Sequence, residues 1–306
     1  MLLILILAVM ISVLIPIYNY NVVTLVTQIH AQLQLCDIPF EIICLDDAST
    51  SDCVVKNEKI SNFEFITYLK SNTNLGRTSA RQYLSGKATY EWLLFLDADV
   101  IPKSEKFIKN YLNLITSEYE AIYGGICYDI KKPEADSMLR WVYGKANEEV
   151  NASTRNKTVY KSIVSANFLM KKTIFINLNS KIEGKGYGYD NYFGTLLKSN
   201  NIKVLHIDNE VFHYGLEPNE AYITKKEKAA ETLLKLYNSG KIDTHQNDLL
   251  KLYIHLKRFR LRSIFSLIYK VFKTMFKRHL SGSKPSIKIL QLYRICYMCH
   301  LDKNQL

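Results

Sequence analysis

Two aspartates one residue apart, Asp97 and Asp99, follow an apolar run in the stretch LLFLDADVIP. The run predicts a buried strand that ends where the acids begin. In an extended chain, residues i and i+2 point to the same side, so the two carboxylates would repel each other unless a cation lies beside them. A hard divalent metal that also takes oxygen atoms from a phosphate would resolve this conflict. A solvated strand end, with Asp99 capping the next helix, is the simpler alternative.

Strand and helix patterns alternate around these acids. Strands are expected at 11–17, 40–47, 63–71 and 90–99, and helices at 21–35 and 76–88. This alternation predicts an α/β fold with a mostly parallel central sheet flanked by helices. Functional side chains in such sheets gather at the carboxyl ends of the strands. The sequence places polar pairs at these ends, namely Tyr18-Asn19, Asp46-Asp47 and Asp97 with Asp99.

The composition fits one large folded domain with an appendage. The chain has 306 residues, of which 48% are hydrophobic and 23% charged, and this excludes a disordered or fibrous protein. Six thinly spread cysteines favour a reduced, cytoplasmic chain over a disulfide scaffold. Cys296, Cys299 and His300 have the C-x-x-C-H spacing of a haem attachment site. Covalent haem requires export, so an accidental spacing on a helix is favoured over haem or a cysteine-bound metal.

The first seventeen residues are nearly all apolar. They are too few for a spanning helix and lack the basic start of a signal peptide. Residues 11–17 are better explained as a buried strand. Residues 1–10 are expected to extend that strand or to form a short hydrophobic lead, and a weak membrane anchor stays open as an alternative.

The formal net charge of +11 is concentrated near the C-terminus, where residues 251–294 hold twelve lysines or arginines and no acid. Apolar residues recur there every three or four positions, at Leu261, Ile264, Phe265, Ile268, Val271, Phe272, Met275 and Phe276. This pattern predicts an amphipathic basic helix that lies on an anionic membrane surface. Packing of the helix on its own domain is the alternative. No nucleic-acid recognition motif accompanies the basic patch, so nucleic acid is not expected as a partner.

Four stretches, ISVLIPIYN, EIICLDDAST, NTNLGRTSAR and WLLFLDADV, occur in the order and spacing of the inverting family 2 glycosyltransferases, which the chain resembles. A second block at 164–218 resembles the acceptor-side half of the family, in the branch with a G-Y-G-x-E-D type motif. The resemblance implies a GT-A fold. The expected organisation is a hydrophobic lead at 1–10, a GT-A domain at 11–235 divided into a nucleotide-binding half (11–102) and an acceptor-side half (103–235), and a basic helical tail at 236–306.

The resemblance assigns roles to single residues. Donor-binding residues carried over from the family motifs are Pro16, Tyr18, Asn19, Asp47, Arg77, Asp97 and Ala98. Asp47 would contact the base, which favours UDP. Asp99 and His213 would hold Mn²⁺ or Mg²⁺, and a histidine ligand favours Mn²⁺. Arg81 is open between a nucleotide contact and a charge on a helix surface.

At the catalytic position the chain departs from the family pattern, because the acid pair appears as Asp190-Asn191 in GYGYDNYFG. Asp190 is the carboxylate that remains in the motif and is expected to be the general base. Loss of the second acid puts the tuning of the pKa of this base in doubt. Glu183 lies near enough in sequence to replace the missing acid in part.

The expected function is metal-dependent, inverting transfer of a sugar from a nucleotide diphosphate donor to a hydroxyl of a glycan or lipid-linked acceptor, in surface polysaccharide synthesis. The expected location is cytoplasmic, at the inner face of the membrane. A degenerate protein of the same fold that binds a nucleotide sugar or glycan without turnover is the alternative. A membrane-surface scaffold is a further alternative, and the basic tail is the one feature that supports it. A nucleotidyltransferase would need a glycine-rich phosphate loop after the first strand, and PIYNYNVV contains none.

Overall fold

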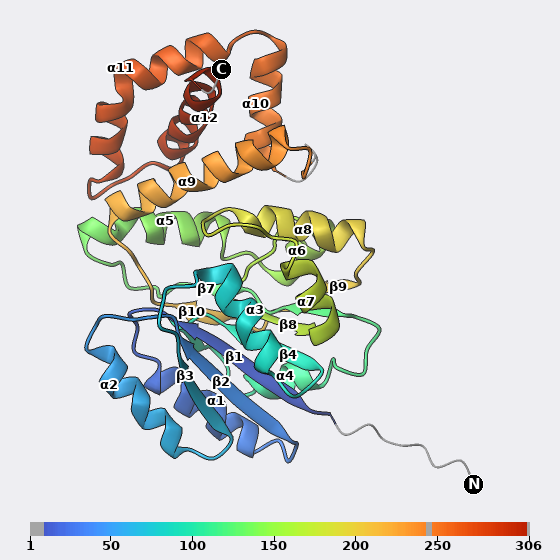
Figure 1. The fold of residues 1–306 in the computed structure, drawn as a ribbon. Helices are drawn as coiled ribbons and strands as arrows, with labels where there is room; N and C mark the ends of the chain where they lie inside the picture. The colour runs from blue at the N-terminus through green and yellow to red at the C-terminus, as the bar shows by residue number, and fades with distance from the viewer. Residues whose placement is uncertain (1–8, 243–246, 305–306) are drawn as a thin grey trace.

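The computed structural model describes residues 9–242 and 247–304 (Figure 1). The part of the hydrophobic lead at 1–8 lies outside the described residues. Within them, seven strands form one sheet in the order β3-β2-β1-β4-β8-β6-β9. β8 runs antiparallel to β4 and β6, and the other pairs are parallel. The strands are β1 (Ile11–Ile17), β2 (Phe40–Asp46), β3 (Ile66–Lys70), β4 (Trp92–Leu96), β6 (Ala121–Tyr123), β8 (Asn167–Lys171) and β9 (Val204–His206). The expected mostly parallel sheet is confirmed.

The central strands β1, β2 and β4 are almost fully buried, which explains their continuous apolar runs. Ile11 pairs with Phe40 on one side and with Trp92 on the other. This register brings the carboxyl ends of the three strands to the same edge of the sheet. The polar residues that follow them therefore lie near one another, as the sequence predicts.

Helices cover both faces of the sheet. The sheet separates the core into two apolar clusters, one on each face. One face is covered by α1 (Val23–Gln34) and α4 (Phe107–Leu112), and α2 (Cys53–Glu58) lies beside β3 (Figure 1). The opposite face carries α3 (Arg77–Lys87), α7 (Lys172–Asn179) and α8 (Tyr189–Ser199). Two further helices, α5 (Met138–Asn147) and α6 (Ala152–Arg155), follow β6 and β7 in the chain.

A second, three-stranded sheet in the order β5-β10-β7 lies at the carboxyl edge of the first. It consists of β5 (Val100–Pro102), β7 (Ile126–Cys127) and β10 (Val211–His213). In this sheet His213 pairs with Val100, the residue that follows Asp99. The pairing brings two residues more than a hundred positions apart into one site.

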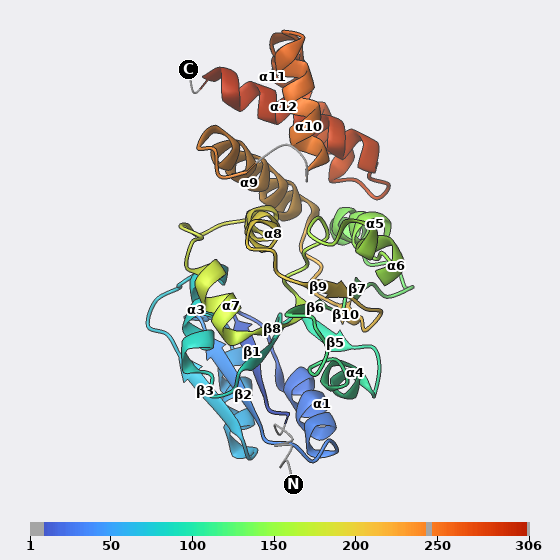
Figure 2. The same cartoon turned by 90° about the vertical axis from the view of Figure 1, so that its right-hand side faces the viewer.

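The C-terminal third is helical and forms a layer above the sheet domain (Figures 1 and 2). It consists of α9 (Asn219–Asn238), α10 (Asp248–Arg258), α11 (Arg262–Leu280) and α12 (Ile287–Asn304). α12 packs along α11 and α9 and contributes buried residues such as Leu290 and Tyr293 to the core shared with the sheet. These tail helices are thus packed on the sheet domain.

The basic stretch 251–294 differs from the single amphipathic helix that was expected. Arg260, with φ of +58°, separates α10 from α11, and a turn that contains Gly282 separates α11 from α12. The apolar residues of α11 divide between two faces. Phe276 is buried with Tyr269, whereas Ile264, Leu267, Val271 and Met275 are exposed.

The C-x-x-C-H stretch is part of the packing of α12. Cys296 and Cys299 are fully buried, and His300 stacks on Tyr269 and hydrogen-bonds with Ser266. Throughout residues 9–242 and 247–304 we find no cluster of three or more histidine, cysteine or acidic side chains suited to a metal. The same described residues contain no helix with the length and apolar character needed to cross a membrane.

Candidate active site

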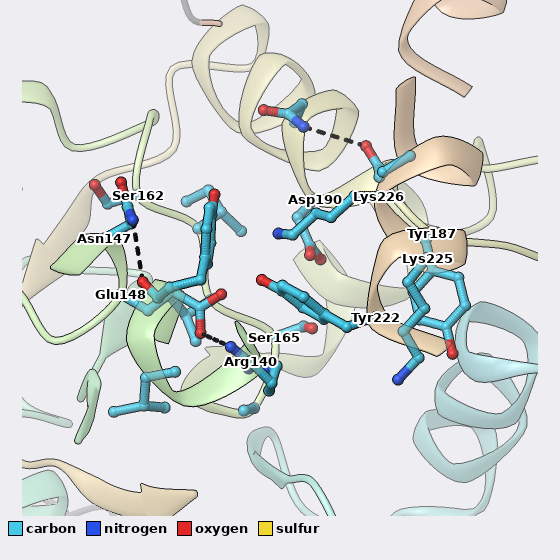
Figure 3. A pocket seen from close by; sticks show the side chains of 18 of the residues that line it. Arg140, Asn147, Glu148, Ser162, Ser165, Tyr187, Asp190, Tyr222, Lys225 and Lys226 are labelled. Carbon is cyan, nitrogen blue, oxygen red and sulfur yellow. Dashed lines mark hydrogen bonds and ion pairs between the residues drawn. The ribbon is translucent and has the colours of Figure 1, made fainter. Parts of the chain in front are cut away.

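A cavity of about 670 Å³ opens where the two sheets, α8 and the C-terminal helices meet. Both halves of the domain and the tail contribute to its wall. Residues that line it include Arg77, Asp97, Asp99, Arg140, Glu148, Ser165, Tyr187, Asp190, Asn191, His213, Tyr222, Lys226, Asn247 and Arg294. The predicted acids, the predicted histidine and the predicted general base therefore share one cavity. Figure 3 shows Asp190 among the residues that line it.

Asp97 is neutralised by a protein cation. β4 ends at Leu96, so the alternation of an extended chain no longer applies to the two aspartates. Asp97 forms a buried ion pair with Arg81, whose side chain is only 8% exposed. Arg81 also donates from Nη2 to the carbonyl of Ser165 at 3.2 Å. A surface role for Arg81 is thereby excluded, since the residue instead fixes the first acid of the motif.

Asp99 faces a different partner. Its Oδ2 lies 3.6 Å from Nε2 of His213. A Cβ atom on Gly215 would lie 1.9 Å from the same oxygen, so only glycine allows the carboxylate to lie there. Burial lowers the pKa of His213, an effect that Asp99 opposes, so the imidazole is neutral near pH 7. The Nδ1 atom of His213 is buried without a hydrogen-bond partner.

Asp99 and His213 could hold a divalent cation whose other coordination positions are filled by a bound substrate or water. A neutral imidazole and a carboxylate are donors that Mn²⁺ accepts, and two protein ligands leave positions for phosphate oxygens and water. The described residues supply no third histidine, cysteine or acid. A metal at Asp99 and His213 would therefore depend on oxygen atoms from the donor substrate.

Asp190 lies in the first turn of α8. Its carboxyl reaches the solvent of the cavity but lies deep among protein atoms, and this burial raises its pKa above the usual aspartate range. Arg81 and Arg77 oppose the shift, and Ser165 hydrogen-bonds with the carboxyl. Arg81 and Ser165 thus link Asp190 to Asp97, which couples the candidate base to the donor side of the cavity.

Asn191, which replaces the second acid of the family motif, contacts the tail. Its Oδ1 accepts a hydrogen bond of 3.0 Å from Nδ2 of Asn247. Asn247 also caps α10, because its Oδ1 accepts from the backbone N–H of Leu250. An amide here can accept from the tail without adding a charge next to Asp190.

The predicted nucleotide residues after β1 and β2 form a hydrogen-bonded pair of loops. Asn19, with φ of +52°, accepts through Oδ1 from the backbone N–H groups of Thr50 and Ser51 at 2.8 and 3.2 Å. Tyr18 is 53% exposed and available for stacking. Pro16 is half-buried within β1.

Asp47 holds the loop before α3. Its carboxylate accepts from the backbone N–H groups of Leu75 and Gly76 at 2.6 and 2.9 Å. These bonds fix the start of α3, where Arg77 projects into the cavity. Contact of Asp47 with a base stays a prediction, as does donor contact by half-buried Ala98.

The glycine-containing loop before α8 covers one side of the cavity. Tyr187 lies between two cations, with its ring centre 5.2 Å from Arg77 and 5.0 Å from Lys225. Gly188 has φ of +97°, and a Cβ there would approach the carbonyl of Ala229 to 3.0 Å. Glu183 is 84% exposed and pairs with Lys241, so it does not replace the missing acid.

Sequence reasoning missed the basic and aromatic wall of the cavity that comes from α5, α9 and α12. The wall includes Arg140, Glu148, Tyr222, Lys226 and Arg294. These residues lie on helices whose register against the sheet is set by tertiary packing. Their one sequence signal is a charged residue within an otherwise apolar helix face.

The sheet order, the second sheet at its carboxyl edge and the cavity between them are those of the GT-A fold of nucleotide-sugar glycosyltransferases. The sequence model of glycosyl transferase family 2 matches residues 12–178, which is more than half of the chain. The chain belongs to this family and is a glycosyltransferase. No curated protein sequence matches the chain.

Several solved structures share this fold. The mannosyltransferase PcManGT from Pyrobaculum calidifontis, in complex with GDP-Man and Mn²⁺, has a TM-score of 0.58 at 13% identity over 96% of this chain and 86% of its own. Glucosyl-3-phosphoglycerate synthase from Mycobacterium tuberculosis, with Mg²⁺ and UDP, has a TM-score of 0.53 at 17% identity over 77% and 81%. S. aureus TarS 1-349, with UDP-GlcNAc, has a TM-score of 0.50 at 15% identity over 97% and 92%. These similarities support the fold.

The buried ion pair between Arg81 and Asp97 gives a stability prediction. Arg81→Met leaves the carboxylate of Asp97 without its cation and should lower the free energy of unfolding by about 3–5 kcal/mol. Adding Asp97→Asn should recover part of that loss, because the uncompensated charge is removed. Lys87→Met, on the exposed surface of the same helix, should change stability by about 0.5 kcal/mol or less. Urea denaturation measures all four proteins. Equal effects of Arg81→Met and Lys87→Met would contradict the role of the ion pair.

Proposed function

We propose that this glycosyltransferase is metal-dependent and inverting, and that it moves a sugar from a nucleotide diphosphate, with UDP favoured, to a hydroxyl of a glycan or lipid-linked acceptor. The observation that supports the proposal most directly is the shared cavity. It brings the carboxylate of Asp190 together with Asp97 and with the pair of Asp99 and His213. The donor complexes of the structural neighbours, with GDP-Man, UDP and UDP-GlcNAc, are consistent with a nucleotide-sugar donor.

Asp190 is the proposed general base. It would accept the proton of the acceptor hydroxyl as that oxygen attacks the anomeric carbon. Attack from the face opposite the leaving diphosphate inverts the anomeric centre in one displacement. The raised pKa of Asp190 makes it a better proton acceptor than a solvated aspartate, and Arg81 and Arg77 oppose the rise and favour the ionised form.

Asp99 and His213 are the proposed ligands of Mn²⁺ or Mg²⁺. When bound, the cation would act as a Lewis acid and stabilise the charge that develops on the leaving diphosphate. Asp97, oriented by Arg81, is proposed to contact the ribose or the donor sugar. Arg77 adds a fixed guanidinium at the mouth of the same site.

Asp190→Asn tests the general base. The substitution should reduce sugar transfer by about 10²–10⁴-fold and leave donor binding close to wild type, because the amide keeps the shape but accepts no proton. Transfer by the wild type should fall with acidification as Asp190 is protonated, at a pH above the ordinary aspartate value of about 3.9. Transfer assays and calorimetry with UDP measure these effects.

Asp37→Asn, on the surface in a left-handed turn that suits asparagine, is the matched control. It should transfer sugar like the wild type. Loss of donor binding and transfer to the same degree in Asp190→Asn would contradict the base assignment. Normal UDP binding without any transfer in the wild type would favour a degenerate, binding-only protein.

Gly215→Ala tests the metal site without removing a ligand. The added methyl group would overlap Oδ2 of Asp99 and displace the carboxylate from His213. Binding of UDP in the presence of Mn²⁺ should weaken by about 10–100-fold, and binding without metal should not change. Gly86→Ala, where a Cβ meets no atom within 4 Å, is the control and should bind like the wild type. Unchanged Mn²⁺-dependent binding in Gly215→Ala would exclude Asp99 from the metal site.

We also propose that the outer face of α11 lies on an anionic membrane, on its cytoplasmic side. Ile264, Leu267, Val271 and Met275 form an exposed apolar stripe on this helix. The exposed cations that flank the stripe are Lys270, Lys273, Lys277 and Arg278. Apolar side chains beside lysines suit the boundary between acyl chains and negative headgroups. Such a location would fit an acceptor in surface polysaccharide synthesis.

Val271→Glu tests the membrane face. Val271 is 62% exposed, so the acid should not disturb the fold, but it should weaken binding to phosphatidylserine-containing vesicles by about tenfold or more. Val55→Glu places the same change on α2 at a valine that is 66% exposed, and it should bind like the wild type. Vesicle sedimentation measures both variants. The proposed face would be wrong if the two variants bound equally.

A further inference from the structure

Three cations line the cavity on the side away from the nucleotide-binding half. We call Arg140 of α5, Lys226 of α9 and Arg294 of α12 the cation cluster. In Figure 3, Lys226, Tyr222 and Asp190 surround one open space, and Arg140 lies beside Tyr222. The general base proposed above and the cation cluster thus face the same part of the cavity.

Only one member of the cation cluster has an acidic partner. Arg140 pairs with Glu148 at 2.8 Å, and its guanidinium lies over the rings of Tyr128 and Tyr222 at 5.2 and 5.3 Å. Among the described residues, no carboxylate lies within ion-pair distance of Lys226 or Arg294. Two positive charges in the cavity wall are therefore left without an anion.

The contacts of these two cations do not neutralise them. The ammonium group of Lys226 lies 3.8 Å from the ring centre of Tyr143 and 4.8 Å from that of Tyr222. Arg294 donates from Nη1 to Gln291 at 2.8 Å, and its Nε is buried without a partner. Arg294 therefore lines the cavity with a buried polar atom that no described residue satisfies, and its hydrogen bond to Gln291 leaves other N–H groups of the guanidinium for a ligand.

The pKa of Lys226 is lowered by its burial and by the cations around it. Burial, followed by the charge of Arg294, lowers the pKa of Lys226 to about 7. The charged and titratable groups that face Lys226 are Arg294, Arg140, Glu148, Glu217, Tyr143 and Tyr222. Glu148 is already paired with Arg140, and Glu217 is paired with Lys225. An added anion would relieve the repulsion between the two free cations.

We propose that Lys226 and Arg294 form a subsite for a phosphate group carried by the acceptor, which narrows the acceptor class of the function proposed above and rests on it. A phosphate monoester carries about −1.5 to −2 charges at pH 7, which matches the two unpaired cations better than a single carboxylate. Arg294 can form hydrogen bonds to phosphate oxygens, and Lys226 adds a point charge. The phosphate would lie near Asp190, so an acceptor hydroxyl on the same molecule would be held beside the base.

The helices that carry the cluster separate this subsite from the donor. The donor residues come from 11–102 together with His213, whereas the cluster comes from α5, α9 and α12. A phosphate at the cluster should therefore bind in addition to the nucleotide. The phosphate could belong to a soluble acceptor or to a lipid headgroup, and these two sources share the same recognition chemistry.

Calorimetric titration of sn-glycerol 3-phosphate into the full chain, without and with saturating UDP and Mg²⁺, tests the subsite. The wild type should bind the probe in both conditions. Lys226→Met and Arg294→Gln should each weaken that binding by about tenfold or more, with binding of UDP and Mg²⁺ unchanged. Lys228→Met, an exposed lysine on the same helix that does not line the cavity, should bind like the wild type.

A second readout uses the charge state of Lys226. Affinity for the probe should fall as the pH rises from 7 to 8.5, because the free lysine loses its proton in this range and must regain it to bind. Lys226→Arg keeps its charge, so its affinity should be nearly constant over the same range. A purely structural role of Lys226 predicts no such difference.

The outcomes separate the two proposals. Binding of UDP without binding of the probe, or equal weakening by Lys228→Met and Lys226→Met, would overturn the phosphate subsite and leave the transferase proposal intact. Failure of UDP to bind while the probe binds would contradict the donor assignment alone. Dihexanoyl phosphatidic acid, titrated in parallel, identifies the source, because tighter binding than glycerol 3-phosphate indicates a lipid acceptor and equal binding a soluble one.

Discussion

The site depends on keeping two neighbouring carboxylates apart and giving each its own partner. Asp97 and Asp99 follow the same strand, and together they would be unstable in a partly buried cavity. The fold separates them by ending β4 at Leu96. Arg81, from α3 on one face of the sheet, neutralises Asp97, and His213, from the second sheet, faces Asp99. Asp99 is left without a cationic partner, so the proposed metal would bind on its side of the motif.

The wall of the cavity formed by α5, α9 and α12 has more cations than acids. Among the described residues, Lys226 and Arg294 face the cavity without paired carboxylates, and the rings of Tyr143 and Tyr222 stabilise the ammonium group of Lys226. Asp190 lies between an acid-rich region with its own cations and this basic wall. Burial raises its pKa, and among its charged neighbours Arg81 and Arg77 oppose this shift while Asp97 adds to it.

Local patterns in the sequence were sufficient for the first four strands of the sheet, β1 to β4, and for the acid motifs, but not for β6, β8, β9 or the second sheet. The runs that form β1, β2 and β4 are continuous because these strands are buried on both faces, and the polar residues after them mark the edge of the site. The partner of Asp97 could not be assigned in the same way. Arg81 looks like an ordinary helical cation in the sequence, and only the packing of α3 against β1 turns it inward.

Prediction from the sequence has the same limit in the C-terminal helices. The spacing of apolar residues in α11 predicts a helix with one apolar stripe, but the periodicity does not say which side is covered by protein. The structure divides these residues between an inner and an outer face, and it brings Arg294 of α12 into the cavity, a contact between elements that no local pattern encodes.

The C-terminal helices connect the chemistry to the surroundings of the protein. α10 reaches the catalytic motif through the hydrogen bond from Asn247 to Asn191, and α12 supplies Arg294 to the cavity. The same layer presents the exposed stripe of α11 on its outer side. Under the two proposals above, positive charges on both sides of this layer would attract phosphate-bearing molecules toward the cavity and the protein toward anionic surfaces. An uncharged Asn191 suits the proposed roles, because a second acid at that position would repel an anionic acceptor beside Asp190, the proposed general base.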